Sequence, residues 1–156
     1  MGNIQLRQVM PDHADLAALI QKLDADLLNR YPEGEIFGLN FDDPKINEVE
    51  FLVAYSDEVP VGCGAIRPLD HESTELKRFF VEQAFRQQGI AKQILIELET
   101  RAKELGFKSI KLEAGAPQPE AIRFYKKHGY YEIDRYGEYV TCESSLCYEK
   151  RILEGV

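Results

Sequence analysis

The segment with the clearest chemical potential joins a hydrophobic run to an amphipathic one. It reads Phe79-Phe80-Val81-Glu82-Gln83-Ala84-Phe85-Arg86-Gln87-Gln88-Gly89-Ile90-Ala91. A helix that begins after Gly89 exposes about four unpaired backbone N–H groups and roughly half a positive charge in its first turn. Gly89 and the small Ala91 let a diphosphate approach these amides closely, and Arg86 adds a charged donor beside them. The segment therefore predicts an anion-binding cradle, and the strand before it offers backbone groups to an extended ligand arm.

The spacing of Arg86, Gly89 and Ala91 also fits a plain turn before a helix. Its place directly after a strand and at the start of an amphipathic helix favours ligand binding. The segment matches neither the G-x-x-x-x-G-K-S/T pattern of phosphate loops nor the G-x-G-x-x-G pattern of dinucleotide-binding folds. Both of those nucleotide-binding classes are therefore excluded.

Hydrophobic periodicity predicts the elements that must position this segment. Strands are expected over residues 4–9, 51–55, 61–66, 75–81, 109–112, 131–133 and 145–148. Helices are expected from Pro11-Asp12 through Leu27, from Ile90 through Leu105 before Gly106, and from Pro119 to His128 before Gly129. Residues 30–48 mix turn formers with aromatic residues and predict an irregular or short-helical segment. This order predicts an α/β sheet domain rather than a simple alternating βαβ array.

Composition narrows the class of protein. The chain has 156 residues, 44% of them hydrophobic and 29% charged, which is typical of one compact globular domain spanning residues 1–156. Its formal net charge of −8 repels phosphate backbones and anionic lipids, so neither nucleic acid nor a membrane is an expected partner. No apolar run approaches the ~20 residues that span a bilayer, and the first residues lack a secretory hydrophobic region.

The cysteines and histidines predict no metal site. Three cysteines, Cys63, Cys142 and Cys147, include no C-x-x-C pair, and the three histidines show no H-x-x-x-H spacing. An odd number of cysteines also argues against a disulfide framework. A reducing cytoplasm is the expected location.

The cradle and a second landmark together resemble the GNAT superfamily of N-acetyltransferases. The acetyl-CoA signature of that family is Gln or Arg, then Gly three residues on, then Gly or Ala, matched here by Arg86, Gly89 and Ala91. Its second landmark, a strand followed by N-x-x-A-x-x-x-Y and a glycine-aromatic turn, is matched by Leu112-Glu113-Ala114-Gly115, Gln118, Ala121, Tyr125 and Gly129-Tyr130. Gln118 departs from the usual Asn, which leaves open the hydrogen bond that this Asn commonly makes to the cofactor.

The resemblance covers nearly the whole chain and implies both the fold and the cofactor. The fold is a mixed, mostly antiparallel sheet, splayed at its centre between the fourth and fifth strands and flanked by helices. The cofactor is acetyl-CoA, acting as acyl-donor co-substrate without a metal. The residues implied in its binding are Phe79, Phe80 and Val81 along the pantetheine arm, Gln87, Gln88, Gly89, Ile90, Ala91 and Lys92 at the pyrophosphate, and Arg86, Gln118 and Tyr125.

The implied reaction is direct attack of a primary amine on the acetyl thioester, with a backbone N–H of the strand polarising its carbonyl. Tyr125 matches the family's usual general acid, although it also fits a core aromatic on its helix. Glu75 matches the catalytic glutamate of the histone-acetylating branch, although it also fits a solvated strand end. Glu113, His71 and an ordered water chain are alternative bases.

The family's acceptor site lies between the first helices and the last strands, which here points to Tyr31, Glu33, Tyr136 and Tyr139. Two acceptor chemistries remain open. Clustered acidic residues, among them Asp24, Asp26, Glu33, Glu35, Asp42 and Asp43, favour a cationic amine or are simply an acidic surface. Arginine side chains instead favour a carboxylate-bearing substrate, from among Arg30, Arg67 and Arg78. Arg78 alternates with Leu76 and Phe80, so we expect the three to share one face of their strand.

The sequence thus predicts an acetyl-CoA-dependent N-acetyltransferase that acts on a small-molecule amine in a ternary complex. A ping-pong route through Cys63 is the less favoured mechanism. Two other functions remain open: a protein lysine or N-terminal acetyltransferase, and a non-catalytic CoA-binding sensor. A homodimer formed through the last strands is common in the superfamily and is a further possibility.

Overall fold

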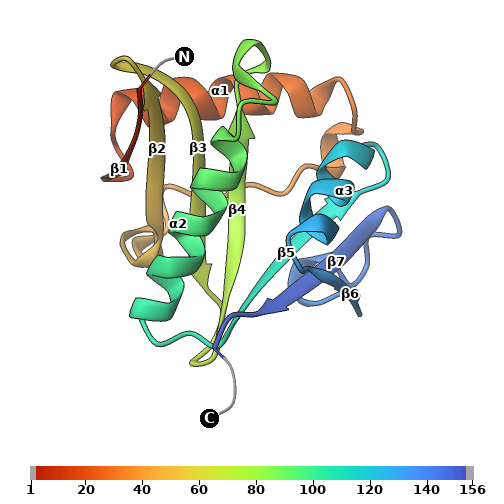
Figure 1. The fold of residues 1–156 in the computed structure, drawn as a ribbon. Helices are drawn as coiled ribbons and strands as arrows, with labels where there is room; N and C mark the ends of the chain where they lie inside the picture. Colours follow the sequence, from red (N-terminus) through yellow and green to blue (C-terminus); the bar gives the residue numbers. More distant parts are fainter. Residues whose placement is uncertain (1–2, 154–156) are drawn as a thin grey trace.

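The computed structural model describes residues 3–153, and of Glu33 only the backbone. Their seven strands form one sheet in the order β1-β2-β3-β4-β5-β7-β6, antiparallel throughout except for the parallel pair β4 and β5 (Figure 1). The strands are β1 (Ile4–Val9), β2 (Glu50–Ser56), β3 (Val59–Pro68), β4 (Ser73–Val81), β5 (Ser109–Gly115), β6 (Tyr131–Ile133) and β7 (Ser145–Arg151). The helices are α1 (Ala14–Leu28), α2 (Ile90–Glu104) and α3 (Pro119–Lys127), with short 3-10 turns η1 (Glu33–Glu35), η2 (Pro44–Glu48), η3 (Gln83–Phe85) and η4 (Gly137–Tyr139).

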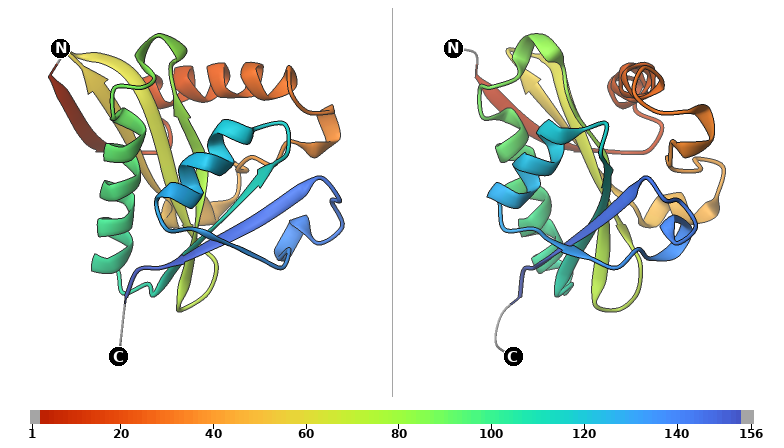
Figure 2. Two further views of the ribbon diagram at one scale, coloured as in Figure 1. Left: turned by 45° about the vertical axis from the view of Figure 1, so that its right-hand side comes forward. Right: turned by 90° about the vertical axis from the view of Figure 1, so that its right-hand side faces the viewer.

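Helices cover both faces of the sheet. Helix α1 lies on one face, and α2 and α3 lie on the other (Figure 2). The central strands are therefore apolar on both sides: in β2, Phe51 and Val53 pack under α1, whereas Leu52 and Ala54 pack under α2. A strand buried on both faces appears in the sequence as a continuous hydrophobic run rather than an alternating one.

Two glycines of β3 let α2 approach the sheet closely. A Cβ atom at Gly62 would lie 3.0 Å from Ile94 Cδ1, and one at Gly64 would lie 2.9 Å from Leu98 Cδ1. Both distances are shorter than in ordinary packing, so a larger residue there would displace these side-chain ends. At Gly62 the Cβ atom would also lie 2.9 Å from the Phe80 carbonyl oxygen, which belongs to the backbone. Ile94 and Leu98 consequently sit in the centre of the core, each at most 1% exposed.

The sheet splays between β4 and β5. The two strands pair only where Ser73–Glu75 lies beside Ser109–Lys111, and beyond that point they diverge (Figure 1). Residues 76–81 of β4 therefore pair with β3 on one side but have no strand on the other. The free edge leaves backbone groups of β4 open to a ligand.

A β-bulge changes the face assignment along β4. Between the pairs Cys63–Phe80 and Ala65–Lys77, the two residues Arg78 and Phe79 lie opposite the single residue Gly64, and Arg78 has a positive φ of 53°. As a result Leu76 packs under α2, whereas Phe80 packs under α1. The expectation that Leu76, Arg78 and Phe80 share one face is wrong, because strict alternation does not continue across the bulge.

The predicted element order and fold class are confirmed. Helix α2 begins after Gly89, which has a positive φ of 81°, and α3 begins at Pro119, as expected from the sequence. The aromatic segment 30–48 forms the short turns η1 and η2. Several strands extend beyond their predicted ends, most clearly β7, which continues to Arg151. No helix within the described residues is long and apolar enough to cross a bilayer.

We expect the core to depend strongly on Ile94. Replacing Ile94 by Ala removes a side chain that is 0% exposed, which typically costs about 2–5 kcal/mol and should lower the melting temperature by roughly 4–20 °C. The matched control is Ile96→Ala on the same helix, where the side chain is 48% exposed, and its melting temperature should change by less than about 2 °C. Equal losses in the two variants would contradict this packing.

Candidate functional site

The larger of two adjoining cavities, with a volume of about 740 Å³, runs from the end of β4 along the start of α2 to α3. It brings together all but one of the predicted cofactor residues. These are Phe79, Phe80, Val81, Arg86, Gln87, Gly89, Ile90, Ala91, Lys92, Gln118 and Tyr125. Gln88 is exposed but does not line the cavity.

The start of α2 presents unused donors to this cavity. No side chain caps the helix at Gly89, and within the described chain the backbone N–H groups of residues 87–92 have no partner in turns, loops or caps. A Cβ atom at Gly89 would meet nothing within 4 Å, so the space before these amides is open. Arg86 is fixed beside them, because its Nε donates to Val81 O at 2.9 Å. The donors and the open space fit a diphosphate.

The same cavity follows the free edge of β4. Phe79, Phe80 and Val81 line it from the strand, and Phe124 and Tyr125 line it from α3 on the opposite wall. The wedge between β4 and α3 has the shape needed for an extended chain that pairs with β4 as an added strand. Coenzyme A, with a diphosphate at one end and an amide-containing arm at the other, fits both parts of the cavity.

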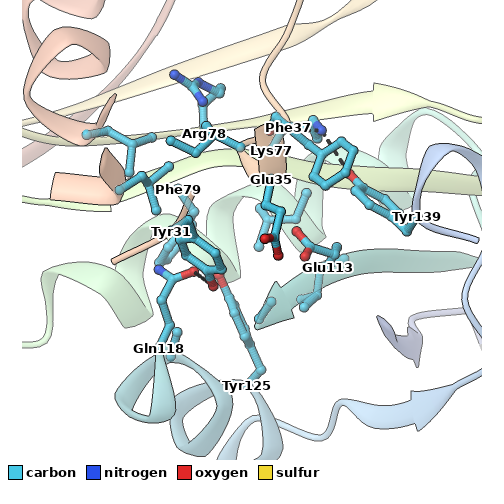
Figure 3. A pocket seen from close by; sticks show the side chains of 17 residues that line it. Tyr31, Glu35, Phe37, Lys77, Arg78, Phe79, Glu113, Gln118, Tyr125 and Tyr139 are labelled. Carbon is cyan, nitrogen blue, oxygen red and sulfur yellow. Dashed lines mark hydrogen bonds between the residues drawn. The ribbon is translucent and has the colours of Figure 1, made fainter. Parts of the chain in front are cut away.

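The smaller cavity, of about 90 Å³, lies where β4 and β5 separate, beneath the segment that follows α1 (Figure 3). Five residues line both cavities: Leu23, Phe79, Gln118, Ala121 and Tyr125. The two spaces therefore meet at these side chains. A group bound in either space would therefore contact the same five side chains.

Tyr125 lies at this meeting point. Its ring belongs to the core and is 7% exposed, and its hydroxyl has no hydrogen-bond partner among residues 3–153. Burial, with a smaller effect of the Glu113 carboxylate, raises the pKa of Tyr125 well above its ordinary value. The hydroxyl is therefore protonated at neutral pH and available as a donor. The two interpretations of Tyr125, core aromatic and cavity donor, are both compatible with this position.

Glu75 is placed differently from the expectation. Its side chain is 0% exposed and lines neither cavity. Its carboxylate pairs with Arg67 and accepts hydrogen bonds from the hydroxyls of Tyr136 and Tyr139, both at 2.7 Å. Glu75 is thus neither a solvated strand end nor a group facing the cavity, but a buried anchor that ties the β6–β7 connection to β4.

Glu113 faces the smaller cavity from β5, and Glu35 faces it from η1 (Figure 3). Burial, reinforced by Glu75 and Glu138, raises the pKa of Glu113 above its ordinary value of 4.5. The Glu35 carboxylate accepts a hydrogen bond from the Ser144 hydroxyl. Glu113 was one of the alternative bases, whereas no spacing in the sequence distinguished Glu35 from the other acidic residues of its segment.

All three candidate arginines are paired with carboxylates. Arg78 pairs with Asp24 of α1, and Arg67 pairs with Glu75. Arg30, which lines the larger cavity, pairs with Glu120 of α3. Each charge is therefore at least partly compensated within the protein. Arg78 nevertheless lines the smaller cavity, and its buried Nε has no hydrogen-bond partner in the described part of the chain.

The other predicted acceptor residues fall into three groups. Tyr31 and Tyr139 line the smaller cavity, and Lys77, which the sequence analysis missed, joins them by donating to the Tyr139 hydroxyl at 2.9 Å. Tyr136 contacts Glu75 and lines neither cavity. The side chain of Glu33 lies outside the described part of the chain.

Comparison with known proteins identifies the family of this chain and agrees with a coenzyme A site. The family model "Acetyltransferase (GNAT) family" matches residues 16–130. A protein named IAA acetyltransferase, from Azospirillum brasilense, is 32% identical over 152 residues, which are 96% of this chain and 99% of that protein.

Solved structures show the same fold. A structure described as an acyl-CoA N-acyltransferase, from Klebsiella pneumoniae, has a TM-score of 0.81 at 26% identity and covers 96% of this chain and 98% of its own. A PaiA N-acetyltransferase from Thermoplasma acidophilum, solved in complex with coenzyme A, has a TM-score of 0.71 at 20% identity, with coverages of 96% and 99%. The similarity thus extends over nearly the entire chain.

If the first turn of α2 holds a diphosphate, a carboxylate placed there should repel it. Ala91→Glu is expected to weaken coenzyme A binding by about 10–100-fold in calorimetry, because like charges a few ångströms apart interact by a few kcal/mol near a protein surface. The helix itself should tolerate the change, since acidic residues stabilise a first turn.

The matched control for this prediction is Gln93→Glu. It introduces the same charge in the same part of α2, at an exposed position that does not line the cavity. It should change coenzyme A affinity less than threefold. Equal weakening by both variants would indicate a general charge effect rather than a cradle at Ala91.

Proposed function

Since this chain belongs to the acetyltransferase (GNAT) family and is an acetyl-CoA-dependent N-acetyltransferase, we propose that it acetylates the primary amine of a small molecule. Transfer is direct, within a ternary complex. The observation that carries the proposal is the meeting of the two cavities at Tyr125 and Gln118. Acetyl-CoA occupies the larger cavity, and the amine enters the smaller one.

The size and cover of the smaller cavity support a small acceptor. A volume of about 90 Å³ holds only a few non-hydrogen atoms. The segment after α1 covers it with Tyr31, Glu35 and Phe37. This cover favours a compact amine over a protein chain, which would need an open groove. The similar protein from Azospirillum brasilense carries the name IAA acetyltransferase, which is compatible with a small acceptor.

The charges around the smaller cavity support a cationic acceptor. The charged side chains that line it are Glu35, Lys77, Arg78 and Glu113. Of the two cations, Arg78 is paired with Asp24 outside the cavity lining, and Lys77 donates to the Tyr139 hydroxyl. An alkylammonium group is attracted by the two carboxylates. Because Arg78 is paired with Asp24, its guanidinium has less charge to offer a substrate carboxylate than a free arginine would have.

In the proposed mechanism, bound acetyl-CoA supplies a thioester carbonyl that a neutral amine can attack. Glu113 accepts the proton of the incoming ammonium, because it is the carboxylate on β5 that faces the cavity and burial raises its pKa. Tyr125 donates a proton to the departing thiolate from a hydroxyl that burial keeps protonated. Glu75, the base expected from the resemblance, instead holds Tyr136 and Tyr139 in place.

The proposed function is tested by thiol release from acetyl-CoA with matched acceptors, each an amino acid and its decarboxylated amine. Ethylamine with alanine and ethanolamine with serine are suitable pairs, because the amines have only three and four non-hydrogen atoms. The decarboxylated member of a pair should react at least 10-fold faster in kcat/KM. Preference for the amino acids would contradict the cationic-acceptor assignment, and turnover only with peptide lysines or N-termini would contradict a small acceptor.

Tyr125→Phe should test whether the Tyr125 hydroxyl is the general acid. The substitution keeps the buried ring but removes the proton donor, so kcat should fall by about 10²–10⁴-fold, while the dissociation constant of coenzyme A changes little. Tyr148→Phe, a buried tyrosine of β7 that lines neither cavity, is the matched control. Retention of the full kcat in Tyr125→Phe would show that this hydroxyl is not the acid.

Glu113→Gln and Glu75→Gln should behave differently. The raised pKa of Glu113 means that its base form is lost as the pH falls through a value above 4.5. In the wild type, kcat/KM should therefore fall as the pH is lowered, with a midpoint above pH 4.5. In Glu113→Gln this pH dependence should disappear, and kcat should fall by about 10²–10⁴-fold. Glu75→Gln should mainly lower the melting temperature. The reverse pattern would make Glu75 the base.

A further inference from the structure

We propose that Tyr31 is a positioning residue that fixes the side-chain amide of Gln118, so that the amide nitrogen of Gln118 serves as a hydrogen-bond donor to the thioester carbonyl of the acyl donor. The inference rests on the proposed function and deepens it. It concerns the position at which this chain carries Gln where the family usually has Asn.

The Tyr31 hydroxyl donates to Gln118 Oε1 at 2.8 Å (Figure 3). Tyr31 is 9% exposed, and burial, reinforced by Glu113, raises its pKa to about 12. The hydroxyl therefore keeps its proton at neutral pH and acts as the donor in this bond. Because the bond occupies Oε1, it fixes which end of the Gln118 amide turns toward Tyr31 and which end is left free.

The free end of Gln118 is a donor. Its Nε2 has no hydrogen-bond partner within residues 3–153, and the side chain does not cap α3 although Gln118 is the residue before the helix. Gln118 lines both cavities, as Phe79 and Tyr125 do. The thioester must lie at this meeting point, since the amine reaches its carbonyl carbon from the smaller cavity. A preorganised N–H at that point can stabilise the negative charge that develops on the carbonyl oxygen.

Two further contacts hold Tyr31 against the start of α3. A Cβ atom at Gly115 would lie 2.6 Å from the Tyr31 hydroxyl oxygen, so only glycine at the end of β5 lets Tyr31 approach. Next to it, Arg30 pairs with Glu120 and donates to Pro117 O at 3.2 Å. The segment that follows α1 is thus fastened to the segment that carries Gln118, which gives the hydrogen bond a defined geometry.

The test combines Gln118→Leu, Tyr31→Phe and the double variant, with two readouts. In steady-state kinetics, Gln118→Leu should lower kcat by about 10²-fold, and Tyr31→Phe by roughly 3–10-fold, with little change in the KM of the amine. Tyr31→Phe should have no further effect in the Gln118→Leu background, because Tyr31 acts through Gln118. In calorimetry, Gln118→Leu should weaken acetyl-CoA binding several-fold more than binding of coenzyme A, which lacks the thioester.

The matched control is Tyr55→Phe. Tyr55 is buried like Tyr31, and its hydroxyl donates to the Asp15 carboxylate. It lines neither cavity. It should leave kcat within twofold of the wild type. A kcat loss in Tyr31→Phe that adds fully to that of Gln118→Leu would overturn the positioning role. Equal weakening of acetyl-CoA and coenzyme A binding would overturn the thioester contact. Absence of acetyl transfer by the wild-type protein to any amine would instead contradict the proposed function.

Discussion

The site depends on the separation of two strands that begin side by side. β4 and β5 pair only through residues 73–75 and 109–111, and beyond these residues no ladder holds them together. The edge of β4 is left without a partner in the middle of a sheet, where unpaired backbone groups are costly unless a ligand or water satisfies them. The same divergence opens the smaller cavity on one side and the wedge under α3 on the other. One break in pairing thus creates both the binding edge and the place where the two cavities meet.

The divergence has to be stabilised elsewhere, and buried polar contacts do this. Glu75 stands at the last paired position of β4, where Arg67, Tyr136 and Tyr139 surround its carboxylate. These contacts fasten the connection between β6 and β7 to the branching point of the sheet. On the opposite side, Asp24 of α1 pairs with Arg78 at the bulge. Paired charges therefore hold the strands and helix around the smaller cavity, whereas Glu35 and Glu113 face its interior.

The cofactor side could be predicted from the sequence because its parts are neighbours in the chain: β4, the turn and the start of α2 all lie within residues 73–92. The smaller cavity could be predicted only in part. Tyr31, Arg78 and Tyr139 line it as the sequence analysis expected, whereas Glu35 and Lys77 meet there only through the packing of η1 against β4. The bulge at Arg78 also lies beyond pattern analysis, because one extra residue in a strand reverses the faces that alternation assigns. Glu75 shows a further limit of sequence analysis. It matches the position of the family's catalytic glutamate, but its burial depends on tyrosines more than 60 residues away in the chain.

Hydrogen–deuterium exchange with and without acetyl-CoA, and with ATP as the control ligand, shows whether the free edge of β4 and the start of α2 together hold the acyl donor. We expect acetyl-CoA to slow exchange of the backbone amides of residues 79–81, along the free edge of β4, and of residues 87–92, at the start of α2. ATP, which has phosphates but no pantetheine arm, should not protect residues 79–81. Unchanged exchange in both segments at saturating acetyl-CoA would contradict the claim that the splayed strand and the helix start together hold the acyl donor.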